Sequence, residues 1–66
     1  MAVTREQELW AMALWVDREH GDDGERFIAE RVLHFEAKGN AAGKGLWMEV
    51  ARRYVELRKS IEDAPN

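Results

Sequence analysis

Two histidines are the side chains best suited to metal binding or acid–base chemistry, and each has a carboxylate nearby in the sequence. Asp17 stands three residues before His20. Glu30 stands four residues before His34, so each pair would share one face of a helix. A carboxylate and an imidazole at that spacing could begin a metal site or a general-base pair. Two histidines on separate helices supply too few ligands, and we therefore expect no metal site.

Nucleophilic catalysis has equally little support. Besides Tyr54, the hydroxyl side chains are Thr4 and Ser60, and both fall near predicted helix ends. Neither has a base and an orienting acid beside it in the sequence, as a catalytic triad requires. Residues 39–45 have a superficial likeness to a phosphate-binding loop, but the Gly-Lys pair is followed by glycine and no strand precedes it. We expect no enzymatic activity and no bound cofactor.

Composition limits the classes of function further. The chain has 66 residues, no cysteine and a formal net charge of −3. Nucleic-acid binders usually carry a basic excess, so binding to DNA or RNA is disfavoured. The longest apolar run, Leu9 to Val16, is too short to span a bilayer, and we expect no membrane association. The start of the sequence has no signal-peptide pattern, which predicts a cytoplasmic protein. A domain this small buries a modest core, which favours association with a protein partner or with itself.

Glycines divide the chain into three predicted helices, over residues 5–20, 24–38 and 41–60, followed by a disordered tail over residues 62–66. Thr4 and Gln7 have the spacing of a capping box at the start of the first helix. Gly21 suits the left-handed position that follows a helix. The connections are short, so the whole chain is predicted to be one all-α domain, a compact three-helix bundle with short interhelical turns.

The second and third helices carry their own end signals. Asp22 or Asp23 is expected to cap the second helix, and Asp22 with Glu25 has capping-box spacing. Gly39 is expected to end that helix, and Asn40 to cap the third. The glycines at positions 43 and 45 are poor helix formers. They either fray the first turn of the third helix or let a neighbouring helix pack closely.

Apolar stripes at helical spacing predict the core. We expect its main members to be Leu9, Val16, Ile28, Val32, Phe35, Trp47, Val50, Tyr54 and Leu57.

The first helix carries more apolar surface than one neighbour needs. Trp10 and Trp15 point about 140° apart at 100° per residue, so both cannot face the same helix. Either this helix is wedged between the other two, or one tryptophan lies outside. Exposed aromatic side chains often anchor interfaces. The candidate interface is therefore Trp10, Met12, Leu14 and Trp15.

Several short segments carry a family resemblance: Trp10-Ala11, His20-Gly21-Asp22-Asp23, the run from Phe27 to Arg31, and Gly39-Asn40 with Gly43 and Trp47. Together they resemble a family of short uncharacterised alphaproteobacterial helical proteins, classed as a domain of unknown function. The likeness covers about residues 9–57 and implies a bacterial cytoplasmic protein without adding catalytic residues. Gly24 stands where the resemblance would place alanine, which would loosen the start of the second helix.

Three functions remain open at this point. The first is a non-catalytic protein-interaction module, for which a homodimer is the simplest assembly. The second is a small DNA-associated regulator that uses the third helix, whose basic residues are Lys44, Arg52, Arg53, Arg58 and Lys59. The third is an acidic inhibitor of a nucleic-acid enzyme, in which Asp22, Asp23 and Glu25 would imitate phosphates.

Overall fold

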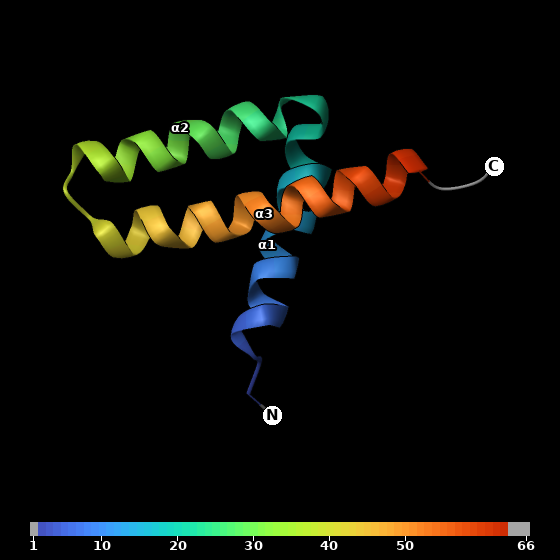
Figure 1. The fold of residues 1–66 in the computed structure, drawn as a ribbon, viewed down its shortest axis with the longest axis horizontal. Helices are drawn as coiled ribbons and strands as arrows, with labels where there is room; N and C mark the ends of the chain where they lie inside the picture. The colour runs from blue at the N-terminus through green and yellow to red at the C-terminus, as the bar shows by residue number, and fades with distance from the viewer. Residues whose placement is uncertain (1, 64–66) are drawn as a thin grey trace.

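Three α-helices make up the fold in the computed structural model, which describes residues 2–63 (Figure 1). They are α1 (Arg5–His20), α2 (Gly24–Ala37) and α3 (Ala41–Asp63), and the 3-10 turn Gly21–Asp23 joins α1 to α2. No strand occurs within residues 2–63, and the predicted all-α, three-helix fold is confirmed. The helix ranges agree with the predicted ones to within three residues.

The helices form two layers. α2 and α3 lie side by side as an antiparallel hairpin, and α1 crosses α3 instead of running alongside it (Figure 1). α1 packs more extensively on α3 than on α2. The shortest dimension of the molecule is 17 Å, and a helix with its side chains is about 10 Å across, so there is no room for a third layer. α1 therefore covers one face of the hairpin, and no described element covers the other.

Most of the predicted helix ends are confirmed in atomic detail. Thr4 Oγ1 accepts a hydrogen bond from the Gln7 N–H at 3.1 Å, and Gln7 Oε1 accepts one from the Thr4 N–H at 3.0 Å, which completes the capping box. Gly21 and Gly39 have φ of 52° and 69°, a region that favours glycine. Asn40 Oδ1 accepts a hydrogen bond from the Gly43 N–H at 2.9 Å and so caps α3.

The expected cap of α2 is wrong. Asp23 occupies the N-cap position without a side-chain hydrogen bond to the helix, and Asp22 binds Arg58 instead. The 3-10 turn provides the reason, because the Gly24 N–H bonds back to the Gly21 carbonyl within this turn. The expected disorder of residues 62–66 is also wrong for residues 62 and 63, which continue α3. Residues 64–66 lie outside the described residues.

The core sits where α1 crosses the hairpin. Its buried apolar side chains are Leu9, Ala13, Val16, Ile28, Val50 and Tyr54. Five of these were predicted, whereas the predicted core residues Val32, Phe35, Trp47 and Leu57 are only half-buried. Val32 and Trp47 pack against the edge of this core and are not enclosed by it.

Two glycines set the close contact between α2 and α3. A Cβ at Gly24 would lie against the ring of Tyr54, and a Cβ at Gly43 would lie against the ring of Phe35. The Tyr54 hydroxyl donates a hydrogen bond to the Gly21 carbonyl at 3.0 Å. Glycine at position 24 therefore makes room for Tyr54, although the resemblance would place alanine there.

Candidate functional site

Three of the four residues of the candidate interface on α1 are exposed. Trp10, Leu14 and Trp15 are 36%, 53% and 42% exposed, respectively. Met12, the fourth member, is half-buried and packs against the core. At 100° per residue it lies about 40° from Val16 and about 60° from Leu9, on the side of α1 that carries the buried residues.

Trp15 belongs to an aromatic cluster at the junction of the three helices. Its ring meets the edge of Phe27 at a centroid distance of 5.8 Å and that of His20 at 5.7 Å. His20 stacks on Phe27 at 4.0 Å, and Phe27 meets Trp47 at 5.7 Å. The ring of Trp15 is therefore held in place by packing on one side while its other side faces solvent.

The histidines serve packing in this arrangement. His20 stacks on Phe27, and His34 lies edge-on to Phe35 at 5.1 Å. Within the described part of the chain, no three His, Asp or Glu side chains come close enough together to hold a metal ion. The expected lack of metal binding stays a prediction, and it is tested below.

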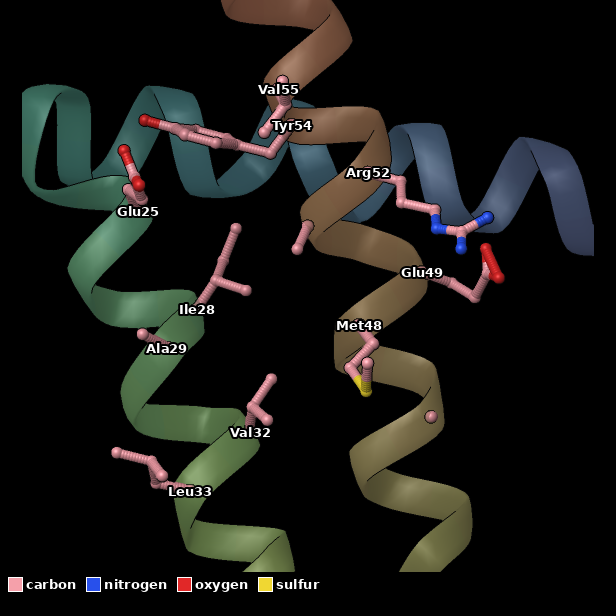
Figure 2. A pocket seen from close by; sticks show the side chains of 12 residues that line it. Glu25, Ile28, Ala29, Val32, Leu33, Met48, Glu49, Arg52, Tyr54 and Val55 are labelled. Atoms are coloured by element: carbon pink, nitrogen blue, oxygen red, sulfur yellow. The ribbon is translucent and has the colours of Figure 1, made fainter.

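A concave surface lies between α2 and α3, on the side of the hairpin opposite α1 (Figure 2). We call it the α2–α3 groove, and its volume is about 730 Å³. Its apolar side chains come from both helices, and α1 passes behind them (Figure 2). The groove is lined by Glu25, Ile28, Ala29, Val32, Leu33, Gly45, Met48, Glu49, Ala51, Arg52, Tyr54 and Val55.

Three large apolar side chains of the groove are more exposed than covered. Leu33 is 62% exposed, Val55 57% and Met48 52%. They lie on the two helices that face each other across the groove (Figure 2). Contiguous exposed apolar surface of this kind is uncommon on a monomeric protein and marks sites of interaction. The α2–α3 groove is therefore the strongest candidate for a binding site.

Sequence reasoning missed this groove because it assigned the apolar stripes of the second and third helices to the core. The signal was nevertheless in the sequence. At 100° per residue, Met48 and Val55 lie about 20° apart on α3 and about 140° to 160° from Val50. On α2, Leu33 lies about 140° from the buried Ile28. The apolar arc of each helix is thus wider than one partner helix can cover.

The groove rim carries charges of both signs. Glu25 stands on α2, and Glu49 and Arg52 stand on α3. Glu49 is engaged in an ion pair with Arg53 at 2.6 Å. Glu25 and Arg52 form no ion pair or hydrogen bond through their side chains with other residues of the described range.

Ion pairs on the opposite face attach α1 and the 3-10 turn that follows it to α3. Arg53 binds Glu6 at 2.6 Å, and Arg58 binds Asp17 at 2.7 Å and Asp22 at 2.9 Å. The hydrogen bond from Arg53 lowers the pKa of Glu6 below its ordinary value. These carboxylates in turn raise the pKa values of both arginines, which stay charged at any physiological pH.

The basic residues of α3 therefore do not form one free stripe. Lys44 lies 3.7 Å from Glu36, and the two arginines that bind α1 residues point toward α1. A helix that reads DNA needs its basic and polar side chains free on the face that enters the groove. α3 instead uses one face to hold α1 and presents an apolar face to the α2–α3 groove.

The sequence matches a model of a protein family. The family model described as "Family of unknown function (DUF6961)" matches residues 5–62. No curated protein and no solved structure matches the chain. None of the helices in residues 2–63 is long and apolar enough to cross a membrane.

Proposed function

The chain belongs to the DUF6961 family, and because that family has no established function, we propose from the geometry that it is a non-catalytic protein-interaction module. Its partner binds in the α2–α3 groove. One observation carries the proposal: Leu33, Met48 and Val55 are each more than half exposed around a single apolar groove.

Energetics support this proposal. Covering exposed apolar surface releases about 25 cal/mol for each Å² removed from water, so a partner that fills the groove gains affinity from it. The domain also benefits, because only six apolar side chains are buried among the residues that the structure describes, and no cysteine is present to form a disulfide. A groove between two helices is a common docking place for an amphipathic helix of a partner.

Two alternatives receive less support. A DNA-associated regulator would need a basic face on α3, whereas Arg53 and Arg58 are committed to ion pairs with acidic residues. An acidic inhibitor would use Asp22, Asp23 and Glu25 together, whereas Asp22 is paired with Arg58. The bacterial origin and cytoplasmic location that the resemblance implies, and the absence of catalysis, are parts of the same proposal.

Photo-crosslinking in the native host tests which surface is used. A photoreactive amino acid replaces Leu33 in the groove, Leu14 on α1, or Glu30, an exposed position of α2 that does not line the groove. We expect a discrete adduct from position 33 and none from position 30, with the crosslinked polypeptide identified by mass spectrometry.

The outcomes of that experiment are distinct. An identified adduct from position 33 supports binding in the groove, whichever polypeptide it contains. An adduct from position 14 alone would move the interface to α1, where the tryptophans predict it, and would contradict the groove. The lack of a specific adduct at both positions would contradict the interaction module itself.

A further inference from the structure

We propose that the occupant of the α2–α3 groove is a second copy of this chain. Two α2–α3 hairpins would then pack face to face into a four-helix core, with α1 on the outside of each. This inference rests on the proposed function, which assigns the groove as the binding surface. It adds the identity of the partner and the way in which the two copies align.

The register of the hairpin decides which residues are level with one another. Gly24 lies beside Tyr54, and Phe35 lies beside Gly43. Because α2 and α3 are antiparallel, Glu25 is level with the turn of α3 that contains Arg52 (Figure 2). By the same register, Leu33 is level with Gly45, to within about one helical turn.

A two-fold axis parallel to the hairpin and running along the groove mouth preserves these levels. It places α2 of each copy over α3 of the other, so every neighbouring pair in the four-helix core is antiparallel. Such an interface is isologous, and the same surface must therefore be complementary to itself. Self-complementarity is required of both the charges and the shape of the surface.

The charges at the groove rim are self-complementary under this two-fold axis. Glu25 on one copy comes opposite Arg52 of the second copy, and the axis generates the same pair again. Neither side chain has an ion partner among the described residues of its own chain. A groove built for a strongly acidic or strongly basic partner would carry one sign at its rim, whereas this rim carries one uncompensated charge of each sign on opposite walls.

The shape of the groove surface is self-complementary as well. Leu33 is the most exposed large apolar side chain of the groove, and it is level with Gly45. A Cβ built at Gly45 would meet nothing within 4 Å, so the space above this residue is open. Leu33 of each copy can therefore enter the space above Gly45 of the other. This gives Gly45 a role, since within one chain nothing packs against it.

Sedimentation velocity across micromolar to millimolar concentrations provides the test. We expect the wild type to form a dimer that Leu33→Glu abolishes. The single variants Glu25→Arg and Arg52→Glu each place like charges opposite each other, and each should weaken the dimer about tenfold. The double variant Glu25→Arg, Arg52→Glu restores opposite charges and should recover the wild-type dissociation constant.

Gly45→Leu separates association from folding. A Cβ at this position would meet nothing within 4 Å, and the substitution replaces a poor helix former, so the fold should be retained. It should nevertheless weaken the dimer, because its side chain fills the space that Leu33 of the second copy needs. Leu14→Glu on α1 is the matched control for adding a carboxylate to an exposed leucine, and its dimer should be unchanged.

Three results would contradict the proposal that a second copy occupies the α2–α3 groove. These are a wild type that is monomeric at every concentration, a dimer that persists in Leu33→Glu but is lost in Leu14→Glu, and a charge-reversed double variant no tighter than the singles. A monomer that still gives an adduct with a different polypeptide from position 33 would leave the proposed function standing. The lack of any specific adduct would contradict both the proposed function and the dimer.

Discussion

Replacing Gly24 with alanine tests how closely α3 packs on the start of α2. Helix propensity alone predicts stabilisation, because alanine in a helix interior is favoured over glycine by about 1 kcal/mol. The packing predicts the opposite sign. A Cβ at position 24 would lie 2.6 Å from Cζ and 2.8 Å from Cε1 of Tyr54, distances that no relaxed contact shows.

The size of the expected destabilisation follows from the packing and the hydrogen bond that Tyr54 would lose. Its side chain is only 4% exposed, so the ring cannot swing into solvent and must displace core neighbours, at a cost of about 1–3 kcal/mol. The displaced hydroxyl also loses its hydrogen bond to the Gly21 carbonyl, worth about 1 kcal/mol. Against a propensity gain of at most about 1 kcal/mol, the net destabilisation is about 1–3 kcal/mol.

Thermal unfolding measured by circular dichroism at low micromolar concentration gives the answer. For a domain of this size, the expected loss corresponds to a fall in melting temperature of roughly 5–20 °C. Gly45→Ala is the matched control, since its Cβ would meet nothing within 4 Å, and we expect its melting temperature to rise. A Gly24→Ala variant that is as stable as Gly45→Ala would refute the contact between Gly24 and Tyr54.

Three further predictions concern the core, the ion pairs and metal binding. Val50→Ala removes two methyl groups from a fully buried site and should cost about 1–3 kcal/mol in urea unfolding, and an unchanged midpoint would show that the buried face of α3 is misassigned. The pKa of Glu6 is lowered by Arg53, so its stabilising contribution is present above the ordinary value of 4.5 and is lost as pH falls below it. Glu6→Gln should flatten this acid-side loss of stability in urea titrations, and an identical slope would contradict the role of the Glu6–Arg53 pair. Calorimetry should detect no specific zinc binding, and micromolar affinity that disappears in His20→Ala or His34→Ala would overturn this prediction.

Local signals were sufficient to predict the helices. The capping box at Thr4, the positive φ of Gly21 and Gly39, and the cap at Asn40 all act over a few residues. Such interactions can be read from sequence because both partners lie within one turn. The predicted cap of α2 is wrong because its side chain has a partner that is distant in the sequence. Asp22 binds Arg58, thirty-six residues away, and this long-range partner competes with the local one.

The candidate site could not be predicted because it depends on how α1 lies on the hairpin. A helix that runs alongside α2 and α3 would contact both along their length, whereas α1 crosses α3 and leaves one face of the hairpin open (Figure 1). The apolar width of α3, with Met48 and Val55 off the core stripe, indicated surplus surface. Trp10 and Trp15 instead predict surplus apolar surface on α1.

Covering of the α2–α3 groove by a second copy is tested most directly by the Met48 methyl group. In one chain this side chain is 52% exposed, whereas Met12 is half-buried and provides an internal reference. A soluble paramagnetic reagent broadens the NMR signals of methyl groups that it can reach. At millimolar concentration of the chain, we predict that the Met48 methyl signal is as protected as that of Met12, and that it broadens selectively on dilution. A Met48 signal that stays accessible at every concentration would contradict the dimer.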